Sequence, residues 1–256
     1  MEILFIGTSS GKTNLNRYHT SILLQTENHK MLIDAGDSVS RALIEAGIDY
    51  NFIDSIYLTH YHADHFGGIA SLITQMKLNN RSRTLKIFTH MLLVTGLNSY
   101  LNSCYLFAEA LDFDLIITPF EFDEKIEAAQ NLFLLPRQNQ HIHNKYFLED
   151  LSNVYFISSS LLIEQGDHKI FYTSDIGAKE DLYLFPKEKI DLLITETTHL
   201  QMEDIYTAYK KLKPKKLLLT HIDSSDEIKI SSWFSKLDLQ DQKKVIQTYD
   251  GFKIDL

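Results

Sequence analysis

The chain has 256 residues, 44% of them hydrophobic, which is enough to bury a substantial core in one domain, 1–256. It carries 34 acidic against 25 basic residues, a net charge of −9. This balance argues against a protein that wraps a long nucleic acid, because such proteins present a basic face to the phosphates. The single cysteine excludes an internal disulfide framework. With no signal-peptide pattern and no apolar run of membrane-spanning length, we expect a soluble cytoplasmic protein.

Short apolar runs alternate with amphipathic stretches along the chain, the pattern typical of an α/β protein. Strands are predicted at 3–6, 21–25, 31–34, 53–59, 85–89, 115–118, 131–136, 160–165, 170–174, 192–196, 216–220 and 245–249. Helices are predicted at 38–46, 64–78, 204–212 and 226–237. No segment rich in glycine, serine or proline marks a linker between domains.

Apolar residues in the stretch 91–111 recur at steps of three or four, as on one face of a helix. We expect a helix that packs on the core, and a lid over a functional site or a dimer face remains compatible with that packing. Cys104 lies within this stretch, and we expect it to be a small buried apolar residue.

The densest group of ligand-type side chains is His60-Tyr61-His62-Ala63-Asp64-His65, directly after the predicted strand 53–59. Four such side chains in six residues cannot all reach one metal ion from a regular helix or strand. A turn between a strand and a helix can aim His60 and His62 one way and Asp64 and His65 another. This arrangement predicts two adjacent metal sites. Imidazole and carboxylate ligands suit zinc, with manganese or iron as alternatives.

Further ligand-type residues stand at the ends of later strands. Asp175 follows the strand 170–174 directly, and His221 follows the strand 216–220. A lone residue at such a position is usually a cap or turn residue. Because ligand-type residues follow both of these strands and also the strand 53–59, we expect their loops to lie together at one edge of the fold.

These motifs resemble the metallo-β-lactamase superfamily, and within it the ribonuclease Z-like phosphodiesterases. The matching segments span most of the chain in the family's order: Phe5-Ile6-Gly7-Thr8, Arg17, Thr20-Ser21, 32–36, 59–69, 172–175, 193–196 and 218–221. The resemblance implies an αββα sandwich, with two mixed β-sheets flanked by helices and two divalent metal ions at one edge between the sheets. Zinc is favoured for both ions, with manganese as an alternative.

The resemblance also assigns the ligands. The first metal would be held by His60, His62 and His141, the second by Asp64, His65 and His221, with Asp175 bridging both. His143 remains an alternative to His141, because both follow the predicted strand 131–136 closely. Asp34 matches the family's early aspartate, which supports the histidine loop through hydrogen bonds and is not itself a ligand.

The resemblance implies a hydrolytic mechanism in which water, activated by two metals, attacks a phosphodiester. Asp64 would orient that water and accept its proton. Glu196 and His199 match the family's carboxylate–histidine pair that protonates the leaving oxygen, with Glu196 raising the pKa of His199. The family's histidine usually lies farther along the sequence from the glutamate.

Several departures bear on the substrate. The chain lacks a glycine- and proline-rich basic insertion of the kind that transfer-RNA 3′-processing enzymes use as a clamping arm. It reads Ser-Asp-Ile where many relatives read Gly-Asp-Thr, and the segment 146–157 is longer than a usual hairpin. These differences and the net charge favour a small phosphodiester: a cyclic nucleotide, a cyclic phosphate or a short oligonucleotide. Related phage and bacterial enzymes that degrade cyclic mononucleotides make a cyclic nucleotide the first expectation.

Two other enzyme classes stay open: a ribonuclease Z-type endonuclease that processes transfer RNA, and a glyoxalase II-like thioesterase or lactonase. A non-catalytic binding protein is a third reading, although such proteins typically lose ligands that are all present in this chain. Arg17 and 158–160 could contact phosphate, but ordinary loop and strand roles are favoured for them. The resemblance further implies a homodimer, and the lack of a long apolar run predicts no membrane partner.

Overall fold

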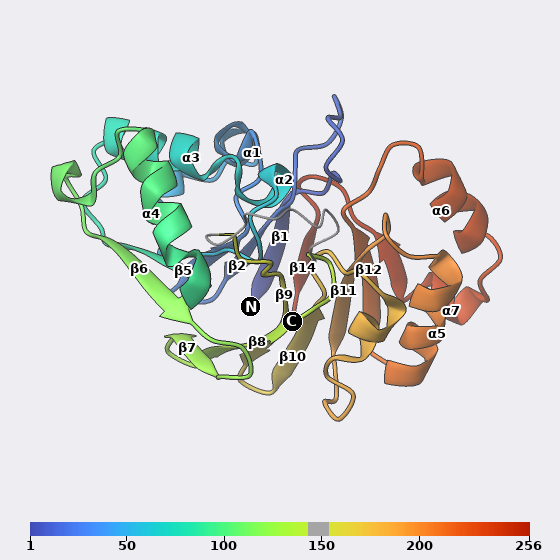
Figure 1. Ribbon diagram of the computed structural model, residues 1–256. Coiled ribbons are helices and arrows are strands. Elements are labelled where there is room, and N and C mark those ends of the chain that lie inside the picture. The colour runs from blue at the N-terminus through green and yellow to red at the C-terminus, as the bar shows by residue number, and fades with distance from the viewer. Residues whose placement is uncertain (143–153) are drawn as a thin grey trace.

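The computed structural model describes residues 1–142 and 154–256, and its core is a pair of facing seven-stranded sheets (Figure 1). The first sheet has the order β14-β1-β2-β3-β4-β5-β6, with β1 (Glu2–Gly7), β2 (Ser21–Gln25), β3 (Lys30–Ile33), β4 (Ser55–Tyr57), β5 (Leu85–His90), β6 (Leu115–Phe120) and β14 (Lys253–Asp255). The second has the order β13-β12-β11-β10-β9-β8-β7, with β7 (Ile126–Ala129), β8 (Leu132–Gln138), β9 (Ser159–Gln165), β10 (His168–Tyr172), β11 (Leu192–Glu196), β12 (Lys216–Thr220) and β13 (Val245–Gln247).

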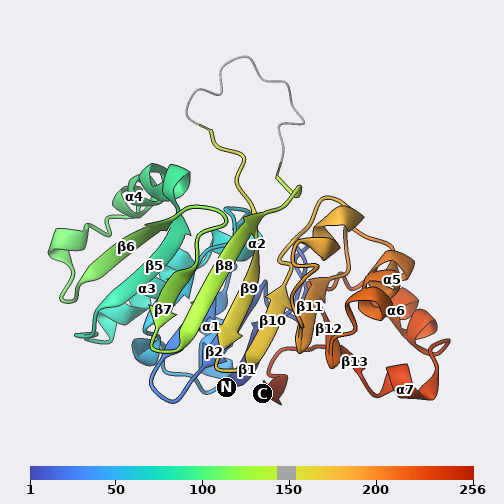
Figure 2. The same cartoon turned by 90° about the horizontal axis from the view of Figure 1, so that it is seen from below.

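Helices cover the outer face of each sheet. Those on the first sheet's side are α1 (Val39–Glu45), α2 (Ala63–Phe66), α3 (Ile69–Leu78) and α4 (Val94–Ser103). Those on the second sheet's side are α5 (Met202–Leu212), α6 (Glu227–Phe234) and α7 (Leu239–Gln242), which Figure 2 shows grouped on its outer side. Short 3₁₀ turns are η1 (Tyr50–Phe52), η2 (Met91–Leu93), η3 (Ala108–Ala110) and η4 (Lys179–Tyr183). The predicted αββα sandwich is confirmed.

Among the described residues, three large apolar clusters hold these layers together. One lies between the sheets and includes Phe5, Tyr57 and Ile194, side chains from both sheets that are fully or almost fully buried. The other two lie between each sheet and its helices. Because strands buried on both faces read as continuous apolar runs, the sequence pattern alone marks most of them.

Strand direction brings distant loops to one edge. In the first sheet β3, β4, β5 and β6 run parallel, and in the second β10, β11, β12 and β13 run parallel. Strand β8 pairs antiparallel with β9, which pairs antiparallel with β10, so β8 points the same way as β10. The carboxyl ends of these strands carry the loops that contain the candidate ligands, and functional loops typically gather at such an edge.

Several expected elements differ from the structure. The predicted helix 64–78 is two helices, α2 and α3, because the chain turns at Gly67-Gly68; a Cβ on Gly68 would lie 2.2 Å from the carbonyl oxygen of Gly36. The predicted helix 91–111 ends at Ser103, and Tyr105 adopts a positive φ of 59°. Cys104 is exposed, so the expectation that it is buried was wrong.

The short strands β7 and β14 and the helix α7 were not predicted, because each has fewer than five residues and lacks a clear periodicity. Much of the long segment 146–157 and the alternative ligand His143 lie outside the described residues. Within the described part of the chain, no helix has both the length and the apolar character that crossing a membrane requires.

Candidate metal centre

The histidine loop between β4 and α2 is held in place by a buried aspartate. Asp34, which directly follows β3 and has a positive φ of 62°, accepts hydrogen bonds from the backbone N–H of Thr59 (2.8 Å) and from the Thr59 hydroxyl (2.9 Å). Its other contact is Nδ1 of His65, at 2.7 Å. Asp34 is fully buried and lies behind the loop, the position expected for a supporting residue that is not a ligand.

The first group of ligand atoms comes from three loops. Nδ1 of His62 lies 3.1 Å from Nε2 of His60 and 3.1 Å from Nε2 of His141, and Nε2 of His141 lies 3.6 Å from Oδ2 of Asp175. The candidate donor atoms of these four residues all lie within 4.8 Å of one another. His60 and His62 follow β4, His141 follows β8, and Asp175 follows β10.

The second group lies directly beside the first and shares Asp175. Nε2 of His221 lies 3.1 Å from Oδ2 of Asp64 and 3.3 Å from Oδ2 of Asp175, and Nε2 of His65 lies 3.2 Å from Oδ1 of Asp175. The donor atoms of these four residues also lie within 4.8 Å of one another, and all four side chains are buried. The structure thus brings together all seven residues expected as ligands.

This geometry fits divalent metal ions. Donor atoms about 2.0–2.1 Å from a zinc ion stand about 3.3 Å apart in a tetrahedron, which matches the separations within both groups. Among the described residues, Nε2 of His65 and Oδ1 of Asp175 are buried without a hydrogen-bond partner. Buried polar atoms are nearly always satisfied, and a divalent cation bound by both of these atoms would satisfy them.

Electrostatics support the same conclusion. Burial holds the pKa of His60 well below its ordinary value and lowers that of His141 to about 4, so both imidazoles are neutral, the form that binds metal. Burial acts against the charge of His65 too, but Asp175 and Asp34 on either side raise its pKa well above the usual range. Asp175 therefore favours positive charge beside Nε2 of His65, which a divalent cation would supply in place of a proton.

A carboxylate–histidine pair lies at the open side of these groups. Glu196 ends β11 and is 1% exposed; its Oε1 lies 3.0 Å from Nδ1 of His199, and its Oε2 accepts the backbone N–H of His199 at 2.9 Å. The hydrogen bond that His199 donates to Glu196 raises the pKa of His199, against the opposing effect of burial. The His199 ring is partly exposed and its centroid lies 4.8 Å from that of His141.

Two hydroxyl groups that sequence reasoning missed orient the histidines. Thr59 Oγ1 lies 3.0 Å from Nδ1 of His60, and Thr198 Oγ1 lies 3.0 Å from Nδ1 of His221. Each contact leaves Nε2 of the ring to face the other donor atoms, the role that second partners of metal-binding histidines play. Their only signal in the sequence is that each adjoins a histidine at a strand end.

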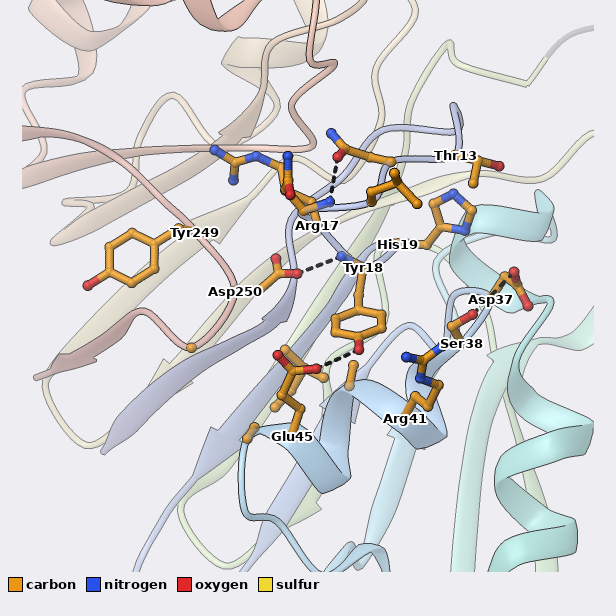
Figure 3. A pocket seen from close by; sticks show the side chains of 17 residues that line it. Thr13, Arg17, Tyr18, His19, Asp37, Ser38, Arg41, Glu45, Tyr249 and Asp250 are labelled. Atoms are coloured by element: carbon orange, nitrogen blue, oxygen red, sulfur yellow. Dashed lines mark hydrogen bonds between the residues drawn. The ribbon is translucent and has the colours of Figure 1, made fainter.

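Of the residues considered as phosphate contacts, Arg17, Ser159 and Ser160 have structural partners, whereas the buried Ser158 hydroxyl has no hydrogen-bond partner among the described residues. Arg17 donates to the Thr8 hydroxyl, to the carbonyl of Thr248 and to Glu227. It lines a cavity of about 880 Å³ between the segment 13–19, helix α1 and the turn 249–251 (Figure 3), and none of the seven expected ligands lines that cavity. Ser159 and Ser160 are buried and donate to backbone carbonyls.

Several known proteins are similar to this chain in sequence or in fold. Ribonuclease Z of Thermococcus onnurineus (strain NA1) is 27% identical over 269 residues, which cover 86% of this chain and 84% of that protein. The metallo-β-lactamase fold protein YhfI of Bacillus subtilis superposes with a TM-score of 0.74 at 20% identity, over 99% of this chain and 98% of that one. The short form of human tRNase Z gives a TM-score of 0.73 at 17% identity, over 100% and 99%.

The model of one family, described as Anti-Pycsar protein Apyc1, matches residues 1–243. This match covers nearly the whole chain, including both groups of ligand atoms and the Glu196–His199 pair. The protein is thus a metal-dependent phosphodiesterase or nuclease with the metallo-β-lactamase fold and a ribonuclease Z-like sequence, and it belongs to the Anti-Pycsar Apyc1 family.

Proposed function

We propose that the chain hydrolyses cyclic nucleotides or closely related small phosphodiesters. The observation that carries this proposal is the pair of four-residue ligand groups that share Asp175, with His199 and Glu196 at their open side. Paired metal sites of this kind suit displacement at phosphorus, and a protonated histidine beside them supplies the acid for the leaving group.

Two zinc ions are proposed as the cofactors. His60, His62 and His141 would hold the first ion, Asp64, His65 and His221 the second, and Asp175 would bridge them. Five imidazoles and two carboxylates favour zinc over magnesium or calcium, which prefer oxygen ligands, and manganese is the alternative. When bound, the two ions would lower the pKa of a water molecule and neutralise charge on the phosphoryl group.

The side chains of this protein would then move the protons. Asp64 would orient the attacking water through a hydrogen bond and accept its proton at a carboxylate oxygen. As the water oxygen bonds to phosphorus and the bond to the leaving oxygen breaks, His199 would donate its proton to that oxygen. Glu196 would keep His199 charged before the transfer, because its carboxylate hydrogen-bonds Nδ1 and leaves the outer nitrogen to act as the acid.

We propose a small substrate because of the net negative charge of the chain. The net charge of −9 disfavours a long polyanion, and the sequence contains no basic arm rich in glycine and proline that could clamp a folded RNA. A cyclic mononucleotide carries a single phosphodiester, which two bound cations would attract locally despite the acidic chain.

A screen of zinc-loaded protein tests the proposal. The substrates are 3′,5′-cyclic nucleotides, 2′,3′-cyclic phosphates, a pre-transfer RNA, a thioester and a lactone, with product formation followed by chromatography. We expect turnover of 3′,5′-cyclic nucleotides that exceeds every other rate and disappears with a chelator. Faster cleavage of the thioester or lactone would reject the phosphodiesterase assignment.

A transfer-RNA 3′-processing endonuclease is the second candidate, because the 27%-identical relative that covers most of the chain is named ribonuclease Z. Efficient cleavage of the pre-transfer RNA in the same screen, without turnover of cyclic nucleotides, would favour it.

We also propose that the chain forms a homodimer, as the resemblance implies. Static light scattering of the eluting protein should give twice the mass of one chain. A monomer across micromolar concentrations would contradict it.

A further inference from the structure

A buried carboxylate near the metal centre has no role in the mechanism above. Asp181 lies in η4 and is 2% exposed. Its Oδ2 accepts backbone N–H groups from Gln140 (3.1 Å), Gly177 (3.0 Å) and Ala178 (3.2 Å), and its Oδ1 accepts the side-chain amide of Gln140 (3.3 Å). Among the described residues no cationic side chain pairs with it, so amide groups alone compensate this buried charge.

These donors belong to two loops that each carry an expected metal ligand. Gln140 precedes His141 directly, and Gly177 and Ala178 follow Asp175 closely. The loops touch through their backbones, since a Cβ on Gly177 would lie only 2.0 Å from the carbonyl oxygen of Gln140. Asp181 therefore joins the loop after β8 to the loop after β10, at the point where glycine allows their closest approach.

A second contact between the same loops holds the backbone that precedes His141. The Asn139 amide donates to the carbonyl of Asp175 at 2.9 Å, and the Asn139 side-chain oxygen accepts the backbone N–H of His141 at 3.1 Å. Asn139 is also buried. The backbone on the amino-terminal side of His141 is thus held by hydrogen bonds at both Asn139 and Gln140.

We propose that Asp181 is a positioning residue that sets the distance between His141 and Asp175 and thereby the affinity of the first metal site. The inference rests on the metal centre of the proposed function. The effect belongs mainly to the first site, because His141 is a ligand of that site alone. Asp64, His65 and His221 stand on α2 and after β12, elements that Asp181 does not contact through hydrogen bonds.

The main test replaces the charge at nearly constant volume. Asp181→Asn keeps the shape but turns one acceptor oxygen into a donor that would face N–H groups. The matched control is Asp241→Asn: Asp241 is 5% exposed and accepts hydrogen bonds from Tyr206, Tyr209 and Lys210 on the outer side of the second sheet. Both variants remove a buried, hydrogen-bonded carboxylate, but only one of them borders the metal centre.

The measurement is metal content after equilibration with increasing chelator, together with the visible spectrum of the cobalt-substituted protein. We expect Asp181→Asn to lose the metal ion of the first site at a chelator concentration about 10- to 100-fold below that needed for the parent protein. This is the usual effect of removing a residue that supports a metal ligand. The chelator concentration that removes the ion of the second site should stay near the parental value, and the spectrum of the cobalt-substituted protein should change. Asp241→Asn should lower the melting temperature while both metal affinities and the spectrum remain parental.

Gly177→Ala provides an independent second variant, because it forces the two loops apart without altering the carboxylate. It should weaken the first site in the same direction. Parental metal retention in both Asp181→Asn and Gly177→Ala would overturn the inference, as would equal weakening of both metal sites. Since the readout needs no substrate, a protein that binds two metals but turns over no cyclic nucleotide would reject the proposed function and leave this inference standing.

Discussion

At the scale of single residues, Asp64 carries two proposed tasks, as a ligand of the second site and as the proton acceptor. Burial would raise the pKa of its carboxyl, but the hydrogen bond from His221 and the charge of His65 outweigh burial and hold the pKa below its usual range. Asp64 is therefore ionised at neutral pH.

Asp64→Ala should reduce kcat on a cyclic nucleotide by at least about 10²-fold, because it removes a proton acceptor together with a metal ligand. The control is Asp37→Ala, an exposed aspartate next to the same loop, which should keep parental kcat. Steady-state rates and circular dichroism would be compared for both. Parental activity in a folded Asp64→Ala protein would contradict the role assigned to this residue.

The pH dependence should report on His199. Its raised pKa means that the proton needed by the leaving oxygen is present below that pKa and is lost as the pH rises through it. Glu196→Gln removes the carboxylate that raises the pKa, so the alkaline limb of kcat should move to lower pH. His199→Ala should lose this limb and most of the rate. An alkaline limb that is unchanged in Glu196→Gln would exclude the pair as the acid.

Backbone conformation at the site also belongs to this scale. Asp34, Ser174 and His221 are non-glycine residues with positive φ values of 62°, 52° and 52°. Such conformations cost about 1–2 kcal/mol each and persist only where surrounding contacts enforce them. The sequence identifies these residues by type and position, but their strained conformation follows from the packing of both sheets.

At the scale of elements, Arg81 follows α3 and links the turn before β4 to the turn before β5. Its guanidinium is 2% exposed and donates to the carbonyl oxygens of five residues: Tyr50, Asn51, Ile53, Arg83 and Thr84. Burial lowers its pKa to about 10. A cation that donates to five backbone carbonyls fixes the geometry of several turns at once.

Arg81→Met should reduce the free energy of unfolding by about 3 kcal/mol or more, since it leaves several carbonyl groups unsatisfied in the interior. Arg83→Met, at a partly exposed neighbour, should change stability by less than about 1 kcal/mol. Urea denaturation followed by fluorescence would measure both. Equal stability of the two variants would show that the buried hydrogen bonds contribute little.

Helix boundaries show where the sequence pattern fails. Apolar periodicity predicted one helix over 64–78 and another over 91–111, yet the chain turns at Gly67-Gly68 and at Tyr105. The first break arises because the histidine loop must approach Gly36, a contact between residues about 30 positions apart. Periodicity measures which face is apolar, and it contains no information about such close approaches.

At the scale of the whole molecule, bound metal should stabilise the fold, because the ligands stand on elements of both sheets and converge only in the folded state. Removal of metal with a chelator should lower the melting temperature measured by scanning calorimetry, and added zinc should restore it. Each tenfold rise in free zinc above the dissociation constant adds about 1.4 kcal/mol per site. Magnesium serves as the control cation and should restore little. Identical melting temperatures with and without zinc would contradict the metal centre.

The sequence by itself determined the fold class, the strand runs and the identity of the candidate ligands. Strands that are buried on both faces appear in the sequence as apolar runs, and the motif at 60–65 directly follows one of these runs. The choice of His141 rested on the resemblance, and the structure places it with His60, His62 and Asp175 while His143 lies outside the described residues.

The tertiary structure alone decided which polar groups support those ligands. Thr59, Thr198 and Asn139 contact the ligands, and Asp181 contacts the backbone beside two of them, across sequence separations of up to 41 residues. No local pattern distinguishes these four residues from ordinary turn or cap residues. The physical reason is that propensity and periodicity act over a few residues. The hydrogen bonds that orient a metal centre form only when the carboxyl ends of strands from both sheets meet.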